Sequence, residues 1–186
     1  AFFDFKHMKN IEIKSSAPLY NDISELNEED KYLMDKAIEA RGKAYAPYSK
    51  FSVGAALLLD NGVVVLGNNQ ENAAYPSGMC AERVAIWRAG SEYPDMKVLK
   101  LAISASSSEL GYSLTLVSPL AISASSSISK VDKPVGPCGA CRQSLSEYEI
   151  KQKQPFPILF MGEVGEIIKT DSLNALLPFS FDSSYL

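Results

Sequence analysis

All three cysteines of this 186-residue chain occur in two short motifs whose chemistry suits a metal ion. Cys80-Ala81-Glu82 places a thiol two residues before a carboxylate, and Cys138 and Cys141 flank a two-residue gap. Zinc held by three protein ligands keeps its fourth position for water, which is the arrangement of catalytic zinc sites. The only histidine, His7, lies far off near the N-terminus, so a closed four-ligand site is hard to build. The motifs therefore predict a catalytic zinc bound by Cys80, Cys138 and Cys141.

Charged side chains beside these cysteines complete the predicted site. Glu82 is close enough to the metal ligands to take a proton from a zinc-activated water and deliver it to a substrate. Arg83 follows directly, and its guanidinium can offset the negative charge of three thiolates and donate hydrogen bonds to sulfur. Each cysteine motif also precedes an expected helix, whose N-terminal N–H groups favour anionic sulfur. We therefore expect Glu82 to be catalytic and Arg83 to support the ligands.

The composition is that of an ordinary globular protein, with 46% hydrophobic residues, and the length fits a single domain over residues 1–186. The net charge is −4 and no segment concentrates Lys and Arg, so a small-molecule substrate is expected and a nucleic-acid partner is not. No apolar run approaches the roughly 18 residues that a membrane span requires. The odd number of cysteines argues against a disulfide framework. A reducing, cytoplasmic compartment is therefore expected.

Strands and helices are predicted to alternate along the chain, which is typical of an α/β fold with a parallel or mixed sheet. Asn27, with Asp30 three residues later, is expected to cap the first helix, and Asn61-Gly62 is expected to form a hairpin turn. Residues 11–14 alternate like a short edge strand, and Asp171 is expected to cap a short terminal helix. The predicted helices are 28–43, 79–90 and 139–150, and the predicted strands are 51–60, 63–66, 98–105, 157–161 and 166–169.

The eight residues LAISASSS occur twice, at 101–108 and again at 120–127. One repetition is too little for a repeat architecture, so we interpret it as a local duplication or an artefact of sequence assignment. Only one copy can form a central strand, and the first is assigned to it, which leaves 109–127 as a local insertion. Met8 would make a natural start, so residues 1–7 are interpreted as added residues.

A Cys-x-Glu motif followed by Pro-Cys-x-x-Cys is typical of zinc deaminases that act on nucleobases, with Cys here in place of the first His. With its surroundings, the pattern resembles the small zinc-dependent cytidine deaminases of nucleoside salvage. The resemblance implies a three-layer α/β/α sandwich around a mixed five-stranded sheet, usually assembled as a homotetramer. It covers most of residues 30–182, with the matching segments at 44–51, 53–57, 67–76, 80–83, 137–143, 176–178 and 180–181.

The same resemblance implies roles for individual residues. Cys80, Cys138 and Cys141 would bind one zinc ion per subunit, and Glu82 would carry protons. Asn69 and Glu71 match the residues that hold the ribose hydroxyl, where an unpaired partner would be costly. Phe51 matches the aromatic residue packed against the base. The remaining substrate-binding matches are Ala81 and three residues that reach a neighbouring subunit's site, Ala73, Tyr75 and Phe181.

The expected activity is therefore the hydrolytic deamination of cytidine and 2′-deoxycytidine to their uridine counterparts in pyrimidine salvage. A deaminase of a nucleoside antibiotic of the blasticidin S type is the first alternative, although it lacks the Asn-x-Glu element that Asn69 and Glu71 supply. A non-catalytic zinc-binding module is the second. Cys138 and Cys141 alone would also suit a thiol–disulfide oxidoreductase, but the third cysteine and Glu82 argue against it.

Overall fold

The computed structural model describes residues 11–107 and 131–183, so both 1–7 and 109–127 lie outside the described residues. Its centre is a mixed sheet with the strand order β1-β6-β5-β4-β2-β3, in which β4 and β5 are parallel and all other neighbours antiparallel. The strands are β1 (Leu19–Tyr20), β2 (Phe51–Leu59), β3 (Val64–Asn68), β4 (Val98–Ser107), β5 (Ile158–Met161) and β6 (Ile167–Thr170). The sheet thus has six strands where five were expected, because the two-residue β1 adds to the edge of β6.

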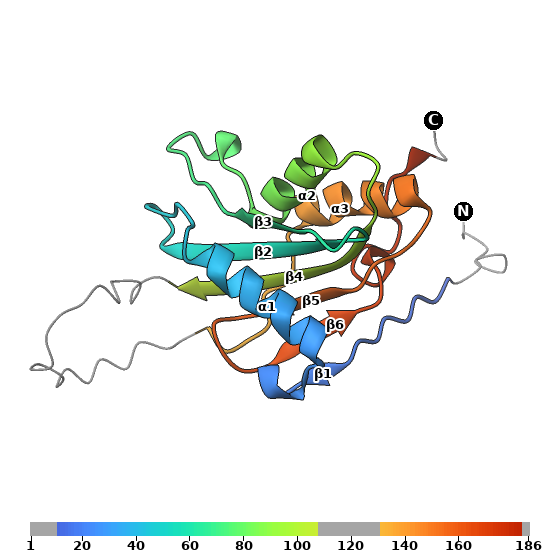
Figure 1. The fold of residues 1–186 in the computed structure, drawn as a ribbon, viewed down its shortest axis with the longest axis horizontal. Coiled ribbons are helices and arrows are strands. Elements are labelled where there is room, and N and C mark those ends of the chain that lie inside the picture. The colour runs from blue at the N-terminus through green and yellow to red at the C-terminus, as the bar shows by residue number, and fades with distance from the viewer. Residues whose placement is uncertain (1–10, 108–130, 184–186) are drawn as a thin grey trace, which may run out of the picture.

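Helices cover both faces of this sheet, which confirms the expected α/β/α sandwich (Figure 1). Helix α1 (Glu28–Arg41) lies on one face, and α2 (Ala81–Glu92) and α3 (Gly139–Gln152) lie together on the other. Three short 3-10 helices complete the described elements: η2 (Ile23–Glu25), η3 (Tyr75–Ser77) and η5 (Leu173–Ala175). Within the described ranges, no helix has both the length and the apolar character needed to cross a membrane.

The alternation of side chains along the central strands divides the core into two layers. In β2, Ala55 and Leu57 pack toward α2 and α3, whereas Ala56 between them packs toward α1. In β4, Ile103 belongs to the first layer and its neighbour Ala102 to the second. All five are essentially fully buried. Both faces of the central strands are covered, which explains why they are continuous apolar runs in the sequence.

Most predicted boundaries of helices and strands lie within two residues of the observed ones, because capping and turn residues mark them locally. The side chain of Asn27 accepts a hydrogen bond from the backbone N of Asp30 at 2.9 Å and caps α1 as predicted. Gly62 has a φ of +81° in the turn between β2 and β3, a conformation that glycine adopts without strain. Residues 101–107 of the first LAISASSS copy lie in β4, between β5 and β2, as predicted, and the second copy lies outside the described residues.

Two predictions of local structure were wrong. Residues 11–14 form no strand, and the edge strand is Leu19–Tyr20, where Leu19 pairs with Ile168 of β6. Alternation alone does not provide a strand partner, and β6 pairs with the later segment. The short terminal helix η5 begins after Ser172 rather than after Asp171, and no side chain caps it. Contacts of η5 with α3 hold this turn instead.

A buried cluster of three charged side chains joins the start of α1 to the sheet through hydrogen bonds. Asp30 is 1% exposed and accepts hydrogen bonds from Lys100 of β4 and from Lys169 of β6. Burial alone would raise the pKa of Asp30, but the hydrogen bonds from the two lysines outweigh it and hold the pKa below its usual value. The carboxylate therefore stays ionised and links three elements that are distant in the sequence.

Candidate active site

Two helix N-termini bring the three cysteines together. Cys80 is the N-cap residue of α2, Cys138 is the N-cap residue of α3, and Cys141 lies in the first turn of α3. Because α2 and α3 pack side by side on one face of the sheet, their first turns meet. The sulfur of Cys138 lies 3.9 Å from that of Cys80 and 3.4 Å from that of Cys141, and all three sulfurs lie within 4.8 Å of one another.

This sulfur cluster fits a single zinc ion. Tetrahedral zinc with Zn–S bonds of about 2.3 Å would place its sulfur ligands roughly 3.8 Å apart, which lies within the range of the observed separations. All three cysteines are free thiols, and soft sulfur ligands suit zinc. The part of the chain that the structure describes contains no other group of three or more candidate ligands. The arrangement is therefore compatible with one zinc site.

Hydrogen bonds and charge favour an anionic sulfur at Cys80. The thiol of Cys141 hydrogen-bonds to Cys80, and together with the guanidinium of Arg83 it lowers the pKa of Cys80 to about 5. The Nη2 atom of Arg83 lies 3.6 Å from the Cys80 sulfur, the contact that the sequence predicted for this residue. Donating to Cys80 and being buried raise the pKa of Cys141 in turn. The contact with Arg83 therefore favours negative charge on the sulfur of Cys80.

Glu82 lies in the first turn of α2, two residues after Cys80, and is only 5% exposed. Burial away from water raises the pKa of its carboxyl group, because desolvation disfavours the charged form. The side chain nevertheless lines a cavity, so it can reach a molecule bound there. A buried carboxyl group beside a sulfur cluster and a cavity is an arrangement suited to proton transfer.

The cavity next to Glu82 has a volume of about 410 Å³, within the usual range for small-molecule sites. Eight residues singled out in the sequence line it: Phe51, Asn69, Glu71, Tyr75, Cys80, Glu82, Arg83 and Cys138. Sequence reasoning missed the rest of the wall: Ser49, Val53, Gln70, Asn72, Gly78, Met79, Ile103, Val135 and Gly136. In the sequence, Val53 and Ile103 look like ordinary strand residues. Only the register of β2 and β4 brings them to the cavity.

Asn69 and Glu71 hold the backbone around the cavity as well as lining it. The side-chain oxygen of Asn69 accepts from the backbone N of Val53 at 2.7 Å, and its Nδ2 donates to the carbonyl of Phe51 at 2.9 Å. The Oε2 atom of Glu71 accepts from the backbone N of Tyr48 and Ser49. A hydrogen bond from the side chain of Ser49, followed by these two, holds the pKa of Glu71 below its usual value. Both side chains therefore position the start of β2, which carries Phe51.

The four remaining predicted binding residues contribute little to the cavity wall. Tyr75 is 72% exposed and packs edge-to-face with Tyr48, with ring centroids 6.2 Å apart. Ala73 is exposed in the same loop, and Phe181 is 59% exposed on the C-terminal segment, where its carbonyl accepts from Gln143. Ala81 is fully buried against β3 and is not part of the cavity wall. In the single chain, only Tyr75 of these four reaches the cavity.

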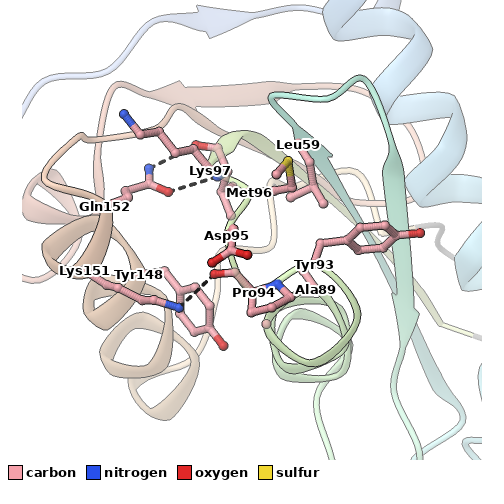
Figure 2. Close-up of a pocket in the computed structure, with 12 residues that line it drawn as sticks. Leu59, Ala89, Tyr93, Pro94, Asp95, Met96, Lys97, Tyr148, Lys151 and Gln152 are labelled. Carbon is pink, nitrogen blue, oxygen red and sulfur yellow. Dashed lines mark hydrogen bonds between the residues drawn. The ribbon is translucent and has the colours of Figure 1, made fainter.

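A second cavity, of about 310 Å³, lies between the C-terminal ends of α2 and α3 (Figure 2). Lys151 donates to the carbonyl of Pro94 across it, and the side-chain amide of Gln152 exchanges two hydrogen bonds with the backbone of Val98. Its polar side chains thus satisfy the backbone where β4 begins. The cysteines lie at the opposite ends of the same two helices.

Comparisons with known proteins agree with this geometry. Residues 27–154 match the family model described as the cytidine and deoxycytidylate deaminase zinc-binding region. The chain is 36% identical over 149 residues to a cytidine deaminase of Halalkalibacterium halodurans, covering 80% of this chain and 91% of the relative. It is 33% identical over 154 residues to a cytidine deaminase of Sporosarcina psychrophila, a match that covers 83% of this chain and 92% of the relative.

Solved structures give the same answer. The crystal structure of cytidine deaminase from Burkholderia pseudomallei superposes with a TM-score of 0.62 at 31% identity, over 84% of this chain and all of that one. The crystal structure of cytidine deaminase from Mycobacterium tuberculosis superposes with a TM-score of 0.55 at 28% identity. The match covers 84% of this chain and 99% of that one. Sequence, fold and sulfur cluster thus agree, and the chain belongs to the cytidine and deoxycytidylate deaminase family of zinc-dependent hydrolytic enzymes.

Proposed function

We propose that this chain hydrolyses the exocyclic amino group of cytidine and 2′-deoxycytidine, yielding ammonia and the corresponding uridine nucleoside, in pyrimidine salvage. The observation that carries the proposal is the position of Glu82, buried beside the three sulfurs and facing a cavity of about 410 Å³. A nucleoside is a small molecule of the kind that such cavities accommodate. The net charge of −4 is consistent with a neutral substrate.

Cys80, Cys138 and Cys141 would hold the zinc ion, and zinc bound in this way acts as a Lewis acid that lowers the pKa of a water molecule toward neutrality. Glu82 would take the proton of the attacking water and pass it to N3 of the pyrimidine, which makes C4 electrophilic. Once the C4–O bond has formed, Glu82 would take the second proton of the attacking water from the new hydroxyl and transfer it to the amine. The C4–N bond then breaks, ammonia leaves and the C4 carbonyl remains. This is the role of the non-ligand glutamate in zinc deaminases.

Asn69 and Glu71 would hold the sugar while Phe51 packs against the base. Among the described residues, the Oε2 atom of Glu71 takes both backbone hydrogen bonds and the carboxylate also bonds to the side chain of Ser49, so a ribose hydroxyl would bind at its remaining lone pairs. Asn69 retains one N–H and one lone pair after bonding to the backbone of β2. Because Asn69 also fixes the carbonyl of Phe51, sugar binding and base packing would depend on the same side chain.

We further propose a homotetramer whose neighbouring subunits contribute Ala73, Tyr75 and Phe181 to one another's sites, with Ala81 supporting the substrate through its backbone. Large aromatic side chains that are mostly exposed in one chain, as Tyr75 and Phe181 are, are typical of surfaces that a partner covers. Sedimentation of the purified protein would measure this, and a monomer would contradict it. Free thiols remain available for zinc in a reducing compartment, which favours the cytoplasm.

Incubation of the purified, zinc-loaded protein with cytidine and with 2′-deoxycytidine tests the proposal. Ultraviolet absorbance and released ammonia should report turnover of both nucleosides. A chelator should abolish turnover, and added zinc should restore it. Blasticidin S, assayed in parallel, tests the rival: its turnover without turnover of either nucleoside would favour an antibiotic deaminase. Bound zinc with no deamination of any of the three would indicate a non-catalytic module.

A further inference from the structure

The guanidinium of Arg83 lies between a metal-ligand sulfur and an aromatic ring. Cys80 caps α2, and Arg83 and Trp87 follow at helical spacings of three and four residues, so the three side chains share one side of the helix. The Nη2 atom of Arg83 lies 3.6 Å from the Cys80 sulfur, and its Cζ atom lies 5.7 Å from the centre of the Trp87 ring. The ring therefore lies within cation–π distance of the group that offsets the thiolate charge.

Little else holds this guanidinium in place. The Nε atom of Arg83 is buried and has no hydrogen-bond partner among the described residues. Within the same residues, no carboxylate forms an ion pair with Arg83. An arginine side chain has many rotamers, and hydrogen bonds from its end to the sulfurs of Cys80 and Cys141 leave the rest of the side chain unrestrained. The aromatic ring is a further restraint, of a different kind, that the structure provides.

Trp87 has no comparable role in the core. It is 44% exposed, and it belongs to neither of the two clusters of buried apolar residues. An indole is the aromatic ring that attracts a cation most strongly. The side chain contacts Arg83 and is not part of the cavity wall, so it is placed to act on the metal site through Arg83.

We propose that Trp87 is a positioning residue that holds Arg83 against Cys80 and thereby slows the release of zinc from the three-thiolate cluster. The proposal rests on the zinc site assigned above. Three thiolates and one Zn²⁺ carry a net negative charge, so a guanidinium held at the sulfur stabilises the bound state. Without the ring, the guanidinium would turn toward water for part of the time, and the cluster would lose that support.

The test is the rate at which the zinc-loaded enzyme transfers its metal to a chromogenic chelator. Trp87→Leu should release zinc about three- to tenfold faster than the parent, the range that a partly shielded cation–π contact allows. Trp87→Phe should restore most of the difference. Tyr32→Leu is the matched control, because it removes an exposed ring from a similar contact with Lys36, 5.8 Å away on α1, and it should leave the rate unchanged.

A double-mutant cycle separates positioning from a general loosening of α2. In an Arg83→Gln background, Trp87→Leu should cause no further acceleration. The same acceleration with or without Arg83, or a parental rate in Trp87→Leu, would overturn the proposal. Melting of the metal-free variants verifies that each is folded. If the parent binds no zinc, both this proposal and the proposed function fail; if it binds zinc and deaminates cytidine, only the role of Trp87 is in question.

Discussion

Gly67 of β3 and Ala81 of α2 approach so closely that a Cβ atom on Gly67 would lie 2.4 Å from the carbonyl oxygen of Ala81. The same Cβ would lie 2.5 Å from the backbone N of Ala85. Backbone atoms cannot rotate away as a flexible side chain can, so this contact sets how near α2 lies to the sheet. The first turn of α2 carries Cys80 and Glu82, and the position of both therefore depends on a residue with no side chain.

We expect Gly67→Ala to displace the start of α2, with two measurable consequences. Overpacking of this kind costs about 1–3 kcal/mol in the free energy of unfolding, and zinc should be released more readily. Urea unfolding of the metal-free protein and zinc retention on dialysis measure the two effects. Gly42→Ala is the control, since Gly42 has ordinary helical geometry and its nearest neighbour would lie 3.4 Å away. Equal behaviour of the two variants would contradict the prediction.

Glu82→Gln should retain zinc and lose turnover. The amide has nearly the shape of the carboxyl group, but it cannot carry the proton, and general acid–base catalysis contributes roughly 10²–10⁴-fold to rate. Zinc content and cytidine turnover, both measured on the same preparation of the variant, test these two expectations. Full turnover in a zinc-loaded variant would remove Glu82 from the mechanism, whereas loss of zinc would show that its carboxyl group is needed to hold the metal site together.

Glu71→Gln should raise KM for cytidine with little effect on zinc content. Loss of a hydrogen bond to a charged group costs about 1.5–3 kcal/mol, or roughly tenfold or more in affinity. The glutamine oxygen can still accept from the backbone N of Tyr48 and Ser49, so the loop should keep its shape. Glu147→Gln makes the same chemical change on the exposed side of α3 and should leave KM unaltered. An unchanged KM in both variants would exclude Glu71 from sugar binding.

Asp30→Asn should destabilise the protein by roughly 3 kcal/mol, because it removes the buried counter-charge of the nearly buried Lys100 and leaves only the exposed Glu29, 3.4 Å away. Glu39→Gln, which affects exposed ion pairs with Lys36 and Lys43, should cost much less, because water screens pairs at the surface. Unfolding free energies from urea titration compare the two. Similar small losses would show that the buried cluster adds nothing beyond a surface pair.

The contribution of Asp30 should also depend on pH. Its pKa in the folded state lies below the usual value, so the unfolded chain binds the proton more readily. The stabilisation is therefore fully present above the unfolded pKa of about 3.9, and it is lost as the pH falls through the folded pKa. The stability difference between parent and Asp30→Asn should be constant near neutrality and should shrink below about pH 4. A difference that persisted undiminished in acid would mean that ionisation of Asp30 is not its source.

Much of the fold could be predicted because its signals are local. Asn27 caps α1 through a bond to a residue three positions away, and Gly62 adopts the turn conformation that its own backbone permits. The wrong predictions concern features without local cause. Residues 11–14 alternate as a strand should, but a strand needs a partner, and β6 pairs with Leu19–Tyr20. The cluster of Asp30 with Lys100 and Lys169 could not be foreseen, because its members come from three separate elements.

The sequence by itself determined which groups the site can use. The spacing within each motif places three thiols and one carboxyl group at the starts of two helices. Only the tertiary structure decided that these helices start side by side, which brings Cys80 within 3.9 Å of Cys138 although 58 positions separate them. It also decided which strand residues form the cavity wall, since that depends on the register of β2 and β4. The physical reason is that bonds between neighbours in the chain act over a few residues, whereas packing across the sheet joins residues at any separation.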